Sequence, residues 1–213
     1  GATVPSMHLA HLLPVLPYLA YYPSALLAIV DIVLGVADIL PIRGFGYLVP
    51  RNATNNSDEI LGVIFDSDAV PNQSQRLTKL TVMMGGPYWR HRSSFPNEDD
   101  VKERALRALH SQLGLSLLTL TSHLENIYAR VMTDTIPQYL VGHPQRMAEL
   151  KAAIKMHPQW RNRLSLLGYS YGGVGVNDCI ANAMDTCDAI CNYEQNRSPL
   201  SDISGLQPAL FPG

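Results

Sequence analysis

The stretch LLGYSYGGVGVNDC, residues 166–179, restricts the possible folds of this chain more than any other segment. It carries four glycines between Gly168 and Gly175, and it follows the apolar run RLSLLG at 163–168. From Val176 onward, apolar residues recur at helical spacing. This order predicts a strand, a tight turn and a helix, as in α/β proteins. Two kinds of chemistry use such a turn: a nucleophilic serine, or a row of backbone N–H groups that binds a ligand.

A serine nucleophile is the first interpretation, because Gly168, Ser170 and Gly172 form the G-x-S-x-G pattern of α/β-hydrolases. Those enzymes place the acid and then the histidine after the serine along the chain. This chain has no histidine beyond His157, so the expected downstream base is missing. A rearranged triad that uses His143 or His157 is the remaining hydrolase alternative.

The second interpretation uses the glycines for their backbone. Gly172, Gly173 and Gly175 lack a Cβ atom, so the chain can turn sharply and a flat ligand can approach the peptide groups. A helix that begins near Val176 directs its free N–H groups and the positive end of its dipole at that ligand. A group that becomes negative during a reaction would be stabilised there. The alternative is a turn whose glycines serve packing alone.

The other elements are predicted from periodicity and turn residues. Asn97 can cap a helix over residues 98–113, and Gly114 can end it. We expect strands at 44–50, 60–67 and 79–86 to form a meandering sheet with local pairing. Further strands are predicted at 25–36, 124–132 and 163–167, and further helices at 7–22 and 144–156. The C-terminal helix should have one apolar face, formed by Val176, Ile180, Ala183, Met184, Cys187 and Ile190.

Composition restricts the class of partner. The chain has 213 residues, 46% of them hydrophobic, which is enough for one large domain or two small ones. Its formal net charge is −2 and its Lys and Arg residues are dispersed, so no nucleic-acid surface is indicated. The three cysteines are an odd number, which argues against a disulfide framework and for a reducing compartment.

The apolar N-terminal part, residues 9–40, raises the question of a membrane span. Three prolines and two aspartates interrupt it before it reaches the roughly twenty apolar residues that a spanning helix needs. We therefore expect a buried helix followed by a buried strand. His8 and His11 lie one helical turn apart, but a zinc site needs three or four ligands and no acid or cysteine is near. We predict no metal site.

Five stretches resemble segments of one family, in the same order along the chain. GYSYGGVGVNDCI (168–180) resembles the C-terminal flavin motif of the protoporphyrinogen oxidases. RGFGYLVP (43–50) and TIPQY (135–139) resemble two further segments of that family, and ILGVIFDSDAVP (60–71) and LTVMMGG (80–86) also match. Several matches in one order are more specific than a single glycine motif.

The resemblance implies the C-terminal half of an FAD-dependent, amine-oxidase-like enzyme with a mixed α/β (α+β) fold. It implies a mixed sheet from the substrate domain, joined to the C-terminal strand and helix of the FAD domain. The expected division is a substrate-binding part at 1–130, an FAD-domain part at 131–195 and a flexible tail at 196–213.

The resemblance also implies the site. The family's enzyme oxidises protoporphyrinogen to protoporphyrin for haem synthesis, passing electrons through FAD to oxygen. Residues that would contact the flavin, mainly through their backbone, are Gly173, Val174, Gly175 and Val176, with Val131 packed nearby. Residues that would line the macrocycle pocket are Phe45, Gly46, Leu48 and Met83. No side-chain acid or base is expected to act in catalysis.

The sequence departs from the family in lacking the opening G-x-G-x-x-G turn, which holds the FAD pyrophosphate, and the arginine that meets the substrate carboxylate. We therefore expect a partial chain, inactive alone, whose partner is the N-terminal FAD-binding half. A non-catalytic flavin- or porphyrin-binding module is the alternative, and a serine hydrolase using Ser170 is a distant one. For a eukaryotic parent, the resemblance implies a peripheral position on the mitochondrial inner membrane.

Overall fold

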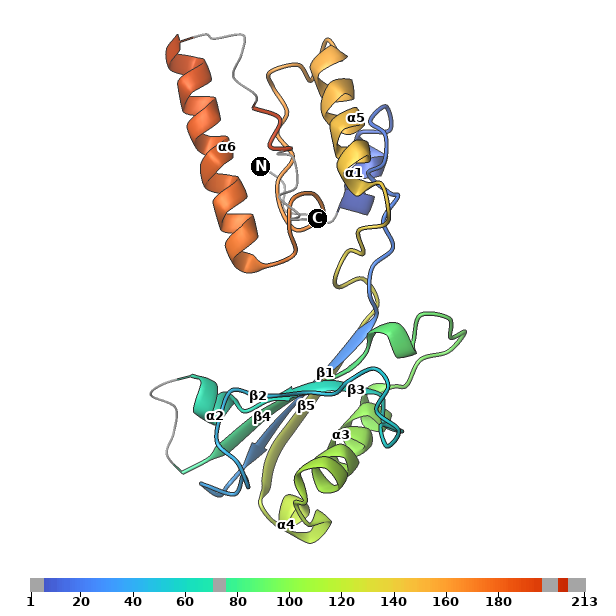
Figure 1. The fold of residues 1–213 in the computed structure, drawn as a ribbon, viewed down its shortest axis with the longest axis vertical. Coiled ribbons are helices and arrows are strands. Elements are labelled where there is room, and N and C mark those ends of the chain that lie inside the picture. The colour runs from blue at the N-terminus through green and yellow to red at the C-terminus, as the bar shows by residue number, and fades with distance from the viewer. Residues whose placement is uncertain (1–5, 71–75, 197–202, 207–213) are drawn as a thin grey trace. The chain divides into compact units, whose positions relative to one another are not determined.

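The computed structural model describes residues 6–70, 76–196 and 203–206, which belong to two compact units. Residues 25–135 form the sheet unit, and residues 1–24 with 136–213 form the helical unit. Figure 1 shows the elements of both. The first 24 residues thus group with the C-terminal part of the chain, whereas the sequence analysis placed them with the sheet.

The sheet unit is built on five strands. They are β1 Leu27–Leu34, β2 Gly46–Leu48, β3 Ile60–Ile64, β4 Thr78–Gly85 and β5 Leu124–Met132. Their order is β2-β3-β4-β1-β5, and every neighbouring pair is antiparallel. The sequence analysis had expected a mixed sheet, with parallel and antiparallel pairs. β1 lies between β4 and β5, so the predicted local meander holds only from β2 to β4. The mixed α/β fold class is confirmed.

Two helices cover one face of this sheet, α3 Glu98–Leu113 and α4 Leu117–Ser122 (Figure 1). Alternate residues of β1, such as Val30 and Ile32, are buried against Ala105 and Leu109 of α3. The predicted cap is confirmed: the Asn97 side chain accepts hydrogen bonds from the N–H groups of Asp99 and Asp100, both at 2.9 Å. Gly114 ends the helix with φ 72°. Two short helical turns complete this unit, α2 Asp66–Ala69 and η1 Gly86–Tyr88.

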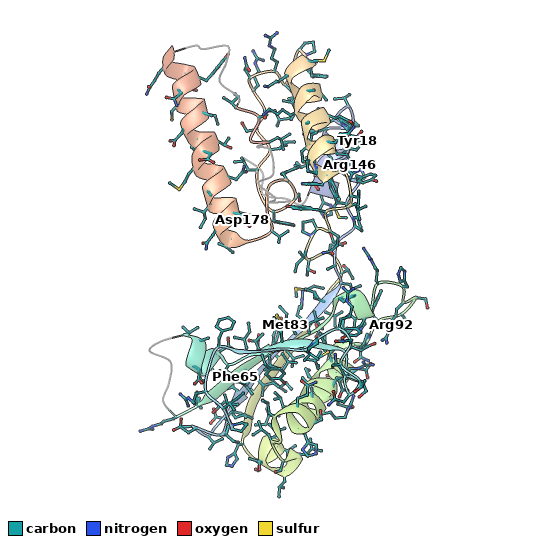
Figure 2. The ribbon with its side chains drawn as sticks, in the orientation of Figure 1. Tyr18, Phe65, Met83, Arg92, Arg146 and Asp178 are labelled. Carbon is teal, nitrogen blue, oxygen red and sulfur yellow. The ribbon has the colours of Figure 1, made fainter. Side chains whose placement is uncertain are left out.

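The other face of the sheet carries the intervening residues of each strand, and we call it the open face. Because side chains alternate along a strand, Met83 on β4 points away from α3 while Val82 points toward it. Figure 2 shows Met83 on this side of the sheet. The side chains of Ile29 and Asp31 on β1 lie on the same face.

The helical unit contains α1 Ser6–Leu12, α5 His143–Met156 and α6 Val176–Asn196. The predicted helix at 7–22 stops early, because Pro14 and Pro17 cannot continue it. The residues after α1 instead pack as turns against α5 and form a second core. Its buried members are Leu13, Leu16, Leu19, Tyr22, Met147, Leu150, Ile154, Leu166, Tyr171 and Leu206.

The predicted strand at 163–167 is wrong. A strand needs a partner strand beside it, with which its backbone exchanges hydrogen bonds. The one sheet of the described residues lies in the sheet unit, whereas residues 163–167 belong to the helical unit. Leu166 N–H instead donates to the carbonyl of Ser204 at 2.9 Å. Its apolar side chain joins the second core.

The expected flexible tail at 196–213 lies mostly outside the described residues. Residues 203–206 are described, and Ile203, Ser204 and Leu206 are buried. The side-chain amide of Asn182 on α6 donates to the carbonyl of Gly205 at 3.0 Å. These four residues are therefore held against the helical unit.

Candidate functional site

The glycine turn leads directly into α6. The first hydrogen bond within α6 runs from Cys179 N–H to the carbonyl of Gly175, at 3.1 Å. The N–H groups of Val176, Asn177 and Asp178 therefore precede the first intrahelical bond and have no acceptor within the helix. Together with the positive end of the helix dipole, such N–H groups are a backbone arrangement that can bind an anion.

Asp178 explains two of the glycines. Its carboxylate accepts a hydrogen bond from Gly175 N–H at 3.2 Å, and its side chain lies against the turn. A Cβ atom on Gly173 would come within 2.6 Å of the Asp178 Cβ, and one on Gly175 within 2.9 Å of its Oδ2. Figure 2 shows Asp178 at the start of α6. Gly173 and Gly175 are thus required by contact with Asp178 in the same chain.

Tyr139, from the TIPQY segment, holds the same turn. Its hydroxyl donates a short hydrogen bond to the carbonyl of Tyr169 and accepts one from Gly173 N–H at 3.0 Å. Burial raises the pKa of Tyr139, so the hydroxyl stays protonated and able to donate. The N–H groups of Gly173 and Gly175 are therefore both occupied. Val174 and Val176, which alternate with these glycines, are exposed residues.

The structure does not support Ser170 as a nucleophile. Ser170 is buried, and neither histidine of the proposed rearranged triad pairs with it. His143 Nε2 lies 2.8 Å from the carbonyl oxygen of Tyr171, and His157 Nδ1 accepts from Gln159 N–H at 3.3 Å. Because a carbonyl can only accept, the proton of His143 must be on Nε2.

Two of the four predicted substrate residues, Leu48 and Met83, lie in one row across the sheet. Phe45 and Leu48 are exposed by 71% and 79%, so they are not core residues. Leu48 pairs with Gly62, and Gly62 pairs with Met83, which places these three residues in one row across the open face. A Cβ on Gly62 would lie 3.0 Å from a methyl carbon of Leu48, so the leucine side chain lies over this glycine.

Gly46 has a structural explanation. Its φ is 142°, and a Cβ there would lie 2.1 Å from the carbonyl oxygen of Val63 on the neighbouring strand. The position therefore needs glycine for strand pairing alone. Val131 pairs with Ala28 and packs on the core beside α3, on the face opposite Met83.

The strand register adds a residue that the sequence analysis missed. Met83 pairs with Ile29, and Ile29 pairs with Arg130 on β5, so the row across the open face ends in an exposed cation. This neighbourhood depends on pairing between strands about a hundred residues apart. No local pattern in the sequence reports it.

The described residues also line cavities outside these groups, and two of them are of note. One of about 230 Å³ on the open face is lined by Asp31, Asp66, Lys79 and Thr81, where the threonine hydroxyl lies 2.9 Å and 2.8 Å from the two carboxylates. The other, of about 250 Å³, lies in the helical unit beside Arg146. Among the described residues, no group of three or more His, Cys, Asp or Glu side chains could hold a metal ion.

Comparison with known proteins shows which proteins this chain is related to. No family model matches it. It is 35% identical to the protoporphyrinogen oxidase of Schizosaccharomyces pombe over 179 residues, covering 83% of this chain and 34% of that protein. It is 31% identical to the human protoporphyrinogen oxidase over 206 residues, covering 92% of this chain and 40% of that protein.

Two solved structures share its fold. One, from Exiguobacterium and provisionally named a protoporphyrinogen oxidase, has a TM-score of 0.68 and 24% identity, covering 88% of this chain and 40% of its own. The other, reduced UDP-galactopyranose mutase, has a TM-score of 0.62 and 10% identity, covering 97% of this chain and 42% of its own.

The chain therefore shares the fold of a protoporphyrinogen oxidase and of UDP-galactopyranose mutase. By its sequence, the chain belongs to the protoporphyrinogen oxidase family, which confirms the resemblance seen in the sequence analysis. It spans 34% to 40% of the length of these relatives, so it corresponds to one part of them.

Proposed function

We propose that this chain is the flavin- and substrate-contacting part of an enzyme that oxidises protoporphyrinogen to protoporphyrin with FAD and oxygen, in haem biosynthesis. The observation that carries the proposal is the sequence identity to named protoporphyrinogen oxidases across up to 92% of the chain. The glycine turn at the start of α6 supports it, because the first N–H groups of this helix have no acceptor within the helix and lie next to the exposed residues Val174 and Val176.

The residues of the turn fit a flavin in a restricted way. Val174 and Val176 are exposed and would face the ring, while Gly173 and Gly175 shape the turn around Tyr139 and Asp178. When bound, FAD would supply hydride acceptance from the substrate and electron transfer to oxygen. The chain would contribute the partial positive charge of the helix start toward the ring edge that becomes negative.

The substrate is proposed to lie on the open face of the sheet. Leu48, Gly62 and Met83 form an apolar row across the open face. Because Gly62 has no side chain, nothing projects from the middle of the row, which suits a flat tetrapyrrole. Gly46 lies two residues before Leu48 on β2, Phe45 precedes it as an exposed residue, and Arg130 at the far end of the row offers a cation for a substrate carboxylate. No side chain of this row acts as an acid or base in the proposal.

The partner is proposed to be the part of the longer protein that the relatives possess and this chain does not span. The outer face of α6 supports this. Val176, Ile180 and Met184 are exposed by 76%, 53% and 63%, while Asn182 and Thr186 are buried on the inner face. The predicted apolar face of α6 thus exists, but it is uncovered in the helical unit. An apolar stripe of this kind is typical of a helix that packs on another part of its protein.

For a eukaryotic parent, the proposed location is the mitochondrial inner membrane, where the protein would be peripheral. Family membership supports this proposal. None of the helices in the described residues is long and apolar enough to cross a bilayer.

Titration of the purified chain with FAD tests the proposal. We expect weak binding, seen as a change in flavin fluorescence at high concentrations, and no turnover of protoporphyrinogen, because the residues that bind the ADP part are not in this chain. The chain with the rest of the longer protein should produce protoporphyrin fluorescence. Micromolar affinity together with turnover by the chain alone would refute the partial-site proposal.

A further inference from the structure

Two stacked rings contact the glycine turn from the segment that enters α5. The rings of Tyr139 and His143 have centroids 4.0 Å apart and are nearly parallel, at 4°. Tyr22 meets the His143 ring edge-on at 4.9 Å. Only 2% of His143 is exposed, so the pair forms a fixed surface beside the turn.

Each ring holds backbone atoms of the turn. The Tyr139 hydroxyl joins the carbonyl of Tyr169 to the N–H of Gly173, and the His143 imidazole donates from Nε2 to the carbonyl of Tyr171. Three alternate residues of the turn are therefore fixed by two side chains. The sequence separation is 30 residues or more for Tyr139, so this is a tertiary contact.

The protonation state and tautomer of His143 determine which hydrogen bond its ring can donate. Burial is the largest cause that lowers the pKa of His143, so the ring is neutral. With the proton on Nε2, the other nitrogen, Nδ1, is a buried lone pair that has no hydrogen-bond partner among the described residues. The ring can therefore donate in one direction only, toward the turn.

We propose that Tyr139 is a positioning residue for the flavin-contacting turn. By bonding Gly173 N–H, it fixes which backbone groups remain free and directs Val174 and Val176 outward as the contact surface. His143 supports this by holding Tyr139 flat and by fixing Tyr171. The inference rests on the proposed function, since it takes the turn to be the flavin contact.

The variant Tyr139→Phe tests the contribution of the hydroxyl apart from that of the aromatic ring. Phenylalanine keeps the stack on His143 and loses both hydrogen bonds of the hydroxyl. Tyr47→Phe is the matched control, because it also removes a part-buried hydroxyl, bonded to Gln112 at 2.8 Å, from the sheet unit. A loss of hydroxyl bonds in general would affect both variants alike.

Amide hydrogen exchange of the full chain gives the first readout. We expect Gly173 N–H to be protected in the unaltered chain and in Tyr47→Phe, and to exchange about tenfold faster in Tyr139→Phe, with little change in the urea midpoint of the helical unit. Unchanged exchange at Gly173 in Tyr139→Phe would overturn the proposal.

Binding of FAD to the same three proteins gives the second readout. We expect Tyr139→Phe to bind FAD about tenfold more weakly and to change the visible circular dichroism of the bound flavin, while Tyr47→Phe matches the unaltered chain. Faster exchange with unchanged FAD affinity and spectrum would show a structural tyrosine and refute the positioning role. If the unaltered chain shows no FAD binding at any concentration, the proposed function fails and the flavin role of Tyr139 falls with it, while the exchange data still decide whether Tyr139 holds the turn.

Discussion

Gly173 shows at the scale of one residue how a motif can be recognised and still be misunderstood. The sequence analysis took its missing Cβ as room for a ligand. In the structure, the Cβ position is filled by Asp178 of the same chain, and φ is 146°, a conformation that L side chains rarely adopt. The glycine is needed so that the turn can close onto Asp178 and Tyr139. Its role in the proposed site is therefore indirect.

Gly173→Ala should destabilise the helical unit by about 2 kcal/mol or more. The alanine would have a strained backbone, and its Cβ atom would also lie 2.6 Å from the Asp178 Cβ, so the two costs are summed. Gly168→Ala is the control, since φ there is 110° but nothing lies within 4 Å of its Cβ position. The control should show the smaller cost of backbone strain alone. Urea unfolding followed by circular dichroism measures both, and equal losses would contradict the role given to Asp178.

His143 should make the helical unit sensitive to acid. Its pKa is lowered in the folded state, mainly by burial, so the unfolded chain binds a proton that the folded chain resists. Stability is therefore complete above the ordinary histidine pKa and is lost as the pH falls below it, down to the lowered folded pKa, by at most about 1.4 kcal/mol per pH unit.

The variant His143→Phe removes this titration and keeps an aromatic ring against Tyr139. We expect the free energy of unfolding of this variant to vary less between pH 7 and pH 5 than that of the unaltered chain. Urea unfolding at a series of pH values measures the difference. A parallel pH dependence in the two proteins would show that other groups control the acid response.

At the scale of elements, the sequence predicted correctly those helix ends and strands that depend on interactions between residues close together in the chain. The cap at Asn97, the helix that follows and Gly114 all depend on residues within one stretch of chain, and the structure confirms them. The β5 strand also agrees with its predicted bounds. The segment 163–167 has the same apolar pattern as a strand, but a strand exists only if another pairs with it. Its backbone bonds to residue 204 instead, which no local pattern indicates.

The C-terminal helix shows a second limit. Its apolar spacing was predicted correctly, but spacing does not say what the face packs against. In the helical unit, the buried contacts of α6 come from Asn182, which donates to Gly205, and from Thr186. The apolar residues lie on the exposed side. Which face of an amphipathic helix is buried depends on the partner present.

At the scale of the whole molecule, the two units have separate cores, one between the sheet and α3 and one between α5 and residues 13–22. The proposed flavin turn belongs to the helical unit and the proposed substrate row belongs to the sheet unit. The relatives are more than twice as long as this chain, by the share of them that it covers. In the proposed function, the part of the longer protein that this chain does not span packs on the uncovered face of α6.

Ile180→Lys tests this at the level of assembly. Ile180 is exposed by 53%, so its replacement should change the free energy of unfolding of the chain by no more than about 0.5 kcal/mol. With the rest of the longer protein present, the same change should lower co-purification strongly, because a charge would be buried in the contact. Asp185→Lys, a charge change on the same helix, is the control. Equal co-purification of both variants and the unaltered chain would contradict the proposed interface.

The sequence by itself determined the strand and helix patterns of the sheet unit, the capped helix and the glycine turn, because each depends on neighbours within a short stretch. It also determined the family, because five such stretches follow one another in the order that the family has. Only the tertiary structure decided that β1 lies between β4 and β5, that Leu48, Gly62 and Met83 share a row, and that Tyr139 and His143 hold the turn. Those arrangements join residues that are far apart along the chain, and their energy comes from pairing and packing that form only when the chain has folded.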